Sequence, residues 1–467
     1  MVPPPATTGD APRLVILGAG VCGLYAALTA LERGAAVTLV EKESRPGGLA
    51  AGQQHGENFY DLGVHMLHAF DREVFDTCAA AMGDERHEVA LHAEIKWAGN
   101  RYHYPLRGRD ILRGIPPLTL ARCLAGLFLA EIESRLARRE DARDAEEALV
   151  QLYGAPLYEF FFEEFTHRYW GLHPRDLSAE FIRRKMPRLS AVDVFKNLLQ
   201  KLRLANPRDT TEGALRFETL HYSATGAETL PRALAREIEA RGGTILLDSE
   251  VTAVRHGGGR VTQVTTSGGA TLPCEACLST LPVPLLLAGL DPPPPRAVRE
   301  SAARLRYKPI AVHGLLVAKP RCMDAHYTYF RDRRFHRVGE PKNAGLRVTP
   351  ADHTVLIVET TCEEGDADWT GEGLADLLAD LEAEGLCSPV EVVEHHLLRA
   401  RHGYPVFSRG FEPHLAAAED FLGTFRNLRS TGRQGAFTYP NMHGAMRMGA
   451  RAAEQLLAAA PADLPGA

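Results

Sequence analysis

The chain opens with two short apolar runs that flank an amphipathic stretch. Arg13–Leu17 and Ala36–Val40 each have the length and composition of a buried parallel strand. Between them, Val21–Arg33 carries Ala and Leu at helical spacing, and Gly34 is suited to end a helix. The pattern predicts a strand–turn–helix–strand unit with a glycine-rich turn after the first strand.

The middle of the chain shows a different pattern. Leu118–Leu204 is rich in Leu, Ala, Arg and Glu and poor in glycine, so it predicts helices. Leu230–Arg241 predicts another amphipathic helix, followed by a strand at Thr244–Leu247. The runs Glu250–Arg255 and Arg260–Thr265 surround three consecutive glycines and predict a β-hairpin.

Strand-like runs return beyond a stretch of four prolines at 292–295. Predicted strands cover Ile310–Ala318, Ala325–Phe330, Val355–Glu359 and Val390–His395. A helix is predicted near Gly373–Glu384, and a long Ala-rich helix at Met442–Ala459.

Together these elements predict an α/β protein whose Rossmann-like nucleotide-binding domain is interrupted by two inserts. The discontinuous nucleotide domain is expected to comprise residues 13–105, 221–290 and 396–460. A helical insert is expected at 106–220, and a sheet-bearing, mixed α+β substrate domain at 291–395. Residues 1–12, with three consecutive prolines and no apolar core, predict a disordered leader rather than a signal peptide.

Composition narrows the functional classes. Of 467 residues, 45% are hydrophobic and 24% charged, and the net charge of −6 argues against a nucleic-acid-binding surface. The most apolar stretches, Leu118–Ile132 and Leu281–Leu290, are shorter than the about 20 residues that span a bilayer. Eight cysteines in a chain of this length predict no disulfide scaffold, and Cys274 and Cys277 are interpreted as ordinary buried cysteines. We therefore expect a cytoplasmic protein with no membrane partner and no metal site, and the high Ala, Arg and Pro content suggests a bacterial source.

The turn after the first strand carries a dinucleotide-binding motif. Gly18, Gly20 and Gly23 form GxGxxG, and Glu41 ends the next strand 23 positions after Gly18. The glycines allow a tight turn, close approach of a pyrophosphate and close packing of helix on strand. The helix N-terminus can hold a diphosphate, while Glu41 can accept hydrogen bonds from ribose hydroxyls.

The segment that follows points to the flavin dinucleotide. Glu41 to Gly48 reads ExxxRxGG, which resembles the FAD-binding segment of the amine oxidase and glutathione reductase class of flavoproteins. The resemblance implies FAD as the cofactor and a glutathione reductase type of nucleotide domain, with Arg45 near the phosphates.

Three further stretches narrow the resemblance. Asp61–His68 and Gly432–His443 are similar to segments of UDP-galactopyranose mutases, and the first is also similar to protoporphyrinogen-oxidase-like proteins. Phe162–Leu177 resembles a motif in the helical domain of both groups. The chain departs from the mutases at Phe437, where they usually have tyrosine, and at Asn441, where they usually have aspartate.

The resemblance implies the residues of the site. The expected FAD-binding residues are Gly18, Gly20, Val21, Cys22, Gly23, Glu41, Lys42, Arg45, Gly47, Gly48, Leu49, Gly63, Val64, His65, Val251, Gly432, Arg433, Asn441, Met442 and Ala445. The start of the last helix is expected to face the flavin pyrimidine, where its dipole stabilises negative charge.

The expected catalytic residues are His65, His68, Arg433, Tyr439 and Arg184. His65 can exchange a proton beside the flavin or only hold a loop, and Arg433 can bind a phosphate or carboxylate. Arg184 and Arg188 are alternative candidates for a phosphate-binding arginine. Tyr169 and Trp170 line either a substrate pocket or the core, and the stretch Phe335, His336 and Arg337 is a candidate for reaching the flavin ring.

Two enzyme functions fit these residues. The first is an FAD-dependent oxidoreductase that removes a hydride from a small polar substrate at flavin N5. The alternative is a redox-neutral nucleotide-sugar mutase that uses reduced FAD, and the departures in the diphosphate-binding residues favour the first. A flavin-binding subunit without turnover is a third possibility. The expected partners are a small-molecule substrate, possibly a nucleotide sugar, and a second copy in a homodimer.

Overall fold

The computed structural model of the protein describes residues 11–97, 99–104, 110, 114–136, 141–185 and 219–459. A five-stranded parallel sheet of order β10-β2-β1-β14-β21 organises the nucleotide-binding part. Its strands are β10 (Thr244–Leu246), β2 (Ala36–Val40), β1 (Arg13–Leu17), β14 (Ala276–Ser279) and β21 (Leu428–Ser430). The predicted strand–turn–helix–strand unit is confirmed.

The two faces of this sheet are covered differently. Leu14 and Ile16 pack in one buried cluster with α1 (Val21–Glu32), α11 (Thr229–Ala240) and α18 (Met442–Ala458). The alternate residues Val15 and Leu17 belong to a second cluster. This alternation is the two-residue period of a strand buried on both faces, and it explains why β1 reads as a continuous apolar run.

The second cluster includes the sheet that carries the predicted hairpin. Its order is β13-β12-β11-β15, with β11 and β12 antiparallel around the glycine triplet, which confirms the hairpin. The strands are β13 (Thr271–Pro273), β12 (Arg260–Thr266), β11 (Val251–Gly257) and β15 (Leu290–Asp291).

A seven-stranded sheet of order β20-β16-β19-β18-β17-β7-β8 forms the second large layer. Its strands are β20 (Val392–Pro405), β16 (Tyr307–Val317), β19 (Thr354–Thr361), β18 (Arg337–Gly339), β17 (Tyr327–Phe330), β7 (Ala93–Trp97) and β8 (Asn100–Tyr104). The four strands predicted beyond the prolines all lie in it. The sheet also takes up β7 and β8, which fall within the segment that the sequence assigns to the nucleotide domain, because β7 pairs in parallel with β17.

Two small sheets connect these layers. They are β3 (Gly52–His55) with β4 (Asn58–Asp61), and β5 (Leu67–His68), β9 (Thr219–Ser223) and β6 (Arg86–Ala90) in the order β5-β9-β6.

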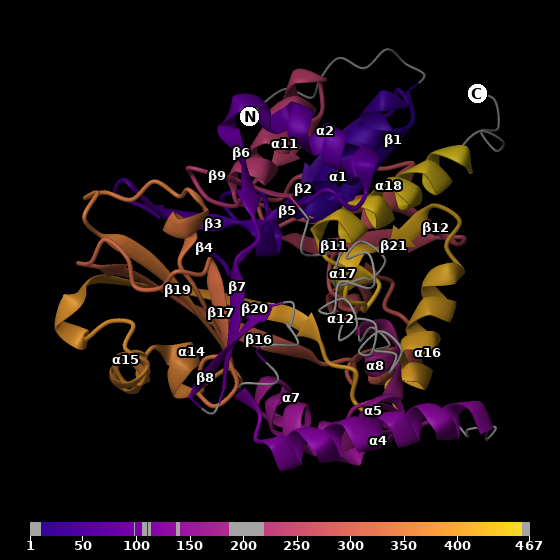
Figure 1. The fold of residues 1–467 in the computed structure, drawn as a ribbon. Helices are drawn as coiled ribbons and strands as arrows, with labels where there is room; N and C mark the ends of the chain where they lie inside the picture. The colour runs from indigo at the N-terminus through magenta and orange to yellow at the C-terminus, as the bar shows by residue number, and fades with distance from the viewer. Residues whose placement is uncertain are drawn as a thin grey trace, which may run out of the picture.

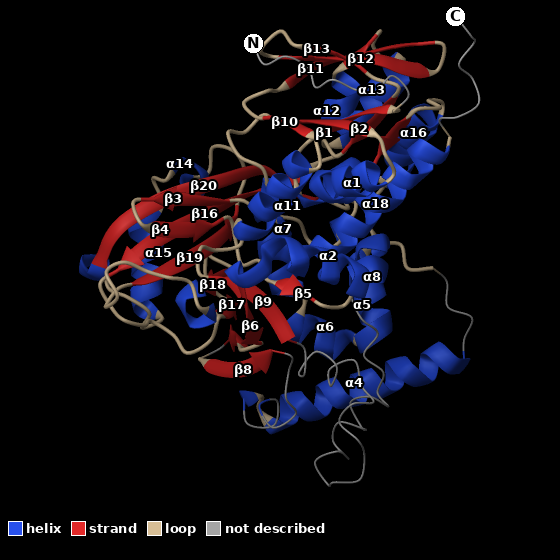
Figure 2. Ribbon diagram, turned by 90° about the horizontal axis from the view of Figure 1, so that it is seen from above, coloured by secondary structure: helices blue, strands red, loops and turns tan. Residues whose placement is uncertain are grey.

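In Figures 1 and 2, α1, α11 and α18 lie together beside the parallel sheet. The predicted helical region contains α4 (Pro117–Leu136), α5 (Ala145–Tyr153), α6 (Ala155–Phe161), α7 (Glu163–Trp170) and α8 (Ala179–Lys185), drawn in purple at the bottom of Figure 1. The remaining helices are α2 (Arg72–Met82), α12 (Val283–Ala288), α13 (Arg296–Ala302), α14 (Ala367–Thr370), α15 (Leu374–Ala383), α16 (Glu412–Gly423) and α17 (Gly432–Gly435).

Some predictions fall outside the described residues. They are most of the leader, at 1–10, and the stretch at 186–218 that includes Arg188. In the part of the chain that is described, no helix combines the length and apolar character needed to cross a membrane.

Candidate functional site

A cavity of about 1410 Å³ lies between the parallel sheet, the seven-stranded sheet and the helical region. Segments from both ends of the chain and from its middle form its wall. Of the predicted FAD-binding residues, those in the wall are Gly18, Gly20, Val21, Cys22, Glu41, Lys42, Arg45, Gly47, Gly48, Leu49, Val64, His65, Val251, Gly432, Arg433, Asn441, Met442 and Ala445. His68 and Tyr439 line it as well, so the structure brings these predicted residues together.

Two predicted glycines contribute in different ways to the turn between β1 and α1. A Cβ atom added to Gly20 would meet only Gly48 Cα at 3.9 Å and Gly47 O at 4.0 Å, so the backbone there is open toward the cavity. A Cβ added to Gly23 would lie 2.1 Å from Gly18 O. Gly20 therefore leaves room for a ligand, whereas Gly23, which is outside the cavity wall, allows the helix to pack on the turn.

Glu41 is held at the carboxyl end of β2 by its own neighbours. One carboxylate oxygen accepts a hydrogen bond from Ala19 N at 2.8 Å, and the other accepts one from Glu43 N at 3.1 Å. Each oxygen has a second lone pair, so the oriented carboxylate can also accept a ribose hydroxyl. Its charge disfavours a 2′-phosphate at the same place.

Two helix N-termini contribute to the same cavity. The residues that cap α1 and α18 are Gly20 and Asn441, and neither forms a side-chain capping bond. The first-turn amides and the positive end of each helix dipole therefore stay available to phosphate and to a negatively charged ring edge.

The two helices also pack very closely. A Cβ added to Gly449 of α18 would lie 2.3 Å from Cys22 O of α1. The short helix α17 approaches α1 too, because a Cβ added to its Gly432 would lie 2.8 Å from Cys22 Sγ. The beginning and the end of the chain thus form one site, and its glycines, carboxylate and helix ends fit the adenine, ribose and phosphates of FAD.

His65 is a neutral imidazole at neutral pH. Burial and the positive charge of Arg337 lower its pKa to about 4, although Glu359 opposes them. Nδ1 lies 3.3 Å from Gly63 O, a group that can only accept, so Nδ1 carries the proton. Nε2 is then an acceptor on a residue that lines the cavity. Gly63 itself lies behind the wall, with a left-handed φ of 105° that suits glycine.

A buried ion pair stands behind His65. Arg337 on β18 donates from Nε and Nη2 to the two carboxylate oxygens of Glu359 on β19, both at 2.7 Å. Glu359 also accepts a hydrogen bond from Val64 N at 2.9 Å. Burial alone would raise the pKa of Glu359, but the charges of Arg337 and His336 hold it well below its ordinary value. The carboxylate therefore fixes the loop that carries His65 to the large sheet.

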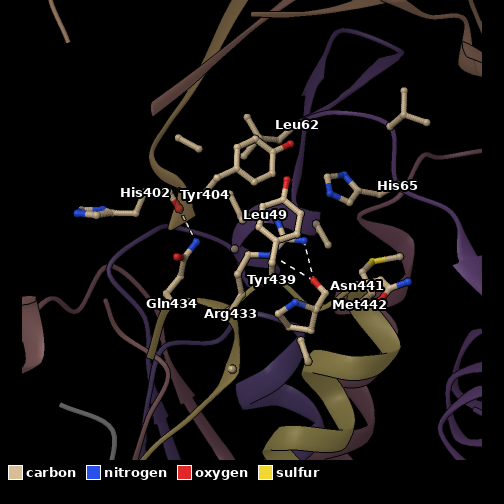
Figure 3. A pocket seen from close by; sticks show the side chains of 18 of the residues that line it. Leu49, Leu62, His65, His402, Tyr404, Arg433, Gln434, Tyr439, Asn441 and Met442 are labelled. Carbon is tan, nitrogen blue, oxygen red and sulfur yellow. Dashed lines mark hydrogen bonds between the residues drawn. The ribbon is translucent and has the colours of Figure 1, made fainter. Parts of the chain in front are cut away.

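Tyrosines and Arg433 form the part of the wall beside His65 (Figure 3). The rings of Tyr404 and Tyr439 are stacked, with centroids 5.1 Å apart, and the hydroxyls of Tyr169 and Tyr439 are 3.4 Å apart. Arg433 lies over Tyr439 at 4.9 Å and donates to Pro440 O from Nη2 at 2.8 Å. In this arrangement Arg433 shapes its own loop, and its predicted role in binding a substrate anion stays a prediction.

The remaining candidates from the sequence lie in different surroundings. His68 stacks on the exposed Phe70 at 5.2 Å. Tyr169 and Trp170 both line the cavity, and Trp170 also packs against Phe181 in the core. Trp170 is therefore both a pocket residue and a core residue. The backbone of Arg184 belongs to α8, while its side chain is outside the described part of the structure.

The sequence did not predict the residues that line the other end of the cavity. Its aromatic residues are Trp97, Tyr102 and Tyr104 from β7 and β8, Phe161 and Phe165 from α6 and α7, and Tyr329 from β17. Aliphatic residues of α4, among them Leu120, Leu124 and Leu127, continue the apolar lining. The alternating aromatics at Tyr102 and Tyr104 were the available signal, because they predict a strand with one apolar face.

The model of the family described as flavin-containing amine oxidoreductases matches residues 21–342. A phytoene dehydrogenase of Streptomyces griseus is 26% identical over 325 residues, which are 63% of this chain and 59% of that protein's own length.

Two solved structures are similar over nearly their whole length. A reduced UDP-galactopyranose mutase superposes with a TM-score of 0.79 at 20% identity, covering 96% of this chain and 94% of the mutase. A putative protoporphyrinogen oxidase from Exiguobacterium sp. 255-15 superposes with a TM-score of 0.70 at 19% identity, covering 96% of this chain and 99% of that one. Identities this low show the fold and not the reaction.

Proposed function

Because the chain belongs to the family of flavin-containing amine oxidoreductases and its cofactor is FAD, we propose that it is an FAD-dependent oxidoreductase that removes a hydride from a substrate with an apolar body. The observation that carries this proposal is the lining of the aromatic end of the cavity, which we call the substrate end. Trp97, Tyr104, Phe161 and Leu124 offer apolar surface to a ligand. The small polar substrate expected from the sequence would gain little from such walls.

The state of the buried arginine near His65 supports the same choice. Arg337 is neutralised by Glu359, so it is not a free cation for a diphosphate. Arg433 is engaged with Pro440 O and two tyrosine rings. A nucleotide sugar, with two phosphates to compensate, fits this arrangement less well than an apolar molecule does.

Bound FAD would supply the hydride acceptor, and the side chains of the chain would arrange the reactants. The apolar walls exclude water and orient the substrate, which makes the reaction effectively intramolecular. His65, neutral and with Nε2 as an acceptor, can hold a substrate N–H or O–H proton. The stacked Tyr404 and Tyr439 form the neighbouring part of the wall.

The test is anaerobic mixing of the FAD-loaded protein with a panel of apolar amines, alcohols and unsaturated acids. We expect at least one member to bleach the oxidised-flavin absorbance without added reductant. His65→Gln should slow that bleaching, whereas His256→Gln, which changes a half-buried histidine outside the cavity wall, should not. Failure of every class of compound to reduce the flavin would contradict the proposal.

The redox-neutral mutase is the second candidate, and the three tyrosines favour it. Tyr169, Tyr404 and Tyr439 cluster in the cavity wall. Burial raises the pKa of Tyr169 and Tyr439 well above the ordinary value, so these two hydroxyls stay protonated at neutral pH. Such hydroxyls can donate to phosphate oxygens. Conversion of UDP-galactopyranose only after reduction by dithionite, with no acceptor consumed, would establish this candidate and reject the oxidoreductase. Action as a cytoplasmic homodimer remains a prediction.

A further inference from the structure

An arginine lies among the aromatic residues at the substrate end of the cavity. Arg331 directly follows β17, lines the cavity and is 9% exposed. Its guanidinium is 4.7 Å from the ring centroid of Trp97, 5.2 Å from that of Phe161 and 5.7 Å from that of Phe165. Nη2 donates a hydrogen bond to Phe161 O.

The charge of this side chain has no counter-ion among the described residues. Nη1 is buried and has no hydrogen-bond partner among them either. No carboxylate of a described residue forms an ion pair with Arg331, whereas its neighbour Arg333 pairs with Glu384 and Arg337 pairs with Glu359. Burial lowers the pKa of Arg331 to about 10, against the weaker opposing charges of Glu164 and Asp332, so the group is still cationic at neutral pH. A buried cation with an unused donor costs free energy unless a ligand satisfies it.

We propose that Arg331 binds the carboxylate of the substrate, so that the substrate is an apolar molecule with an acid group at the end remote from the reacting carbon. The inference rests on the proposed function, because it assigns the substrate class of the same site.

The surroundings define the charge of the ligand. One uncompensated guanidinium matches one negative charge, which a carboxylate carries. A phosphate monoester carries close to two at pH 7 and would leave excess negative charge among Trp97, Phe161 and Phe165.

The path toward His65 defines the body of the ligand. Tyr329, two residues before Arg331, pairs with Ile95 of β7 and lies 5.7 Å from the Tyr104 ring. Arg337, whose charge acts on His65, lies 5.7 Å from the Tyr329 ring. All of these side chains line one continuous cavity, so an apolar chain can extend from Arg331 toward His65.

Isothermal titration calorimetry of the FAD-loaded protein tests the proposal with three probes of equal chain length. We expect decanoate to bind wild-type protein about 10- to 100-fold more tightly than decanol, the value of a hydrogen bond to a charged group. Decyl phosphate should bind more weakly than decanoate. Equal affinity for decanoate and decanol would overturn the proposal, and tighter binding of decyl phosphate would overturn the assignment of a carboxylate.

Two variants locate the effect. Arg331→Met should remove the preference for decanoate over decanol, while Arg333→Met, which loses its ion pair outside the cavity wall, should keep it. If the preference survives in Arg331→Met, the proposal is wrong. If Arg331→Met does not fold, the wild-type comparison of the three probes still decides. Calorimetry needs no turnover, so a protein that selects decanoate through Arg331 but never reduces its flavin would contradict only the proposed function.

Discussion

Removing the charge of Glu359 should destabilise the protein measurably and loosen the loop that carries His65. Glu359 is 2% exposed and accepts both hydrogen bonds of the Arg337 fork, so Glu359→Gln leaves a buried guanidinium without its counter-ion. Breaking a buried pair from one side costs about 3–5 kcal/mol. The glutamine still offers an oxygen to Val64 N, so we expect about 3 kcal/mol, the lower end of that range.

The expected change in melting temperature follows from the size of the chain. For 467 residues, an unfolding entropy of about 2.1 cal/mol/K per residue amounts to roughly 1 kcal/mol/K, so Tm should fall by about 3 °C. Differential scanning calorimetry measures this. The double variant Arg337→Met/Glu359→Gln should melt above Glu359→Gln, because it no longer buries an isolated charge.

An exposed pair of the same residue types supplies the control. Arg296 and Glu300 are 2.6 Å apart on α13, with side chains 85% and 60% exposed. Such pairs contribute about 0–1 kcal/mol, so Glu300→Gln should leave Tm nearly unchanged. If Glu359→Gln and Glu300→Gln have the same Tm, Glu359 does not hold the His65 loop on the sheet.

Three further predictions address other parts of the site. Gly20→Ala should keep the Tm of the flavin-free protein and weaken FAD binding at least tenfold, as measured by flavin fluorescence titration. Gly23→Ala places a Cβ 2.1 Å from Gly18 O and should therefore lower the Tm of the flavin-free protein. Equal effects of the two substitutions on Tm and on FAD binding would refute their separate roles. Burial, with the charge of Glu228, raises the pKa of Asp61 to about 7, so its contribution to stability is present below its ordinary value of 3.8 and is lost as pH rises through 7. The Tm of Asp61→Asn minus the Tm of wild type should therefore increase as pH rises from 4 to 8. A Tm difference that is constant with pH would contradict this. Arg433→Ala should raise the Kd of FAD about tenfold by freeing the loop at Pro440, and an unchanged Kd would show that the loop holds its shape without the arginine.

The nucleotide end of the site could be predicted from sequence because its determinants are local. Gly18, Gly20 and Gly23 lie within six residues, and Glu41 directly follows β2. Each residue type has a conformational or packing reason that holds in any chain with this strand–turn–helix–strand unit. The closing segment at 432–445 could be predicted only from its resemblance to known families, since nothing local indicates that it returns to the first helix.

The substrate end could not be predicted in the same way. Arg337 and Glu359 are 22 residues apart, and only the register of β18 against β19 brings them opposite each other. Trp97 reaches Arg331 because β7 pairs with β17 rather than with a strand of the nucleotide domain. Strand partners and register depend on long-range packing, which hydrophobic periodicity does not encode.

The contact between α1 and α18 has a consequence for how the protein is made. The Ala-rich side of α1 is covered by a helix that ends at Ala458, so a ribosome must synthesise almost the whole chain before that side is shielded. A nascent chain carries this exposed apolar surface throughout elongation, the period in which chaperones bind incomplete domains. Premature termination anywhere before α18 should therefore yield an aggregating polypeptide rather than a shortened enzyme.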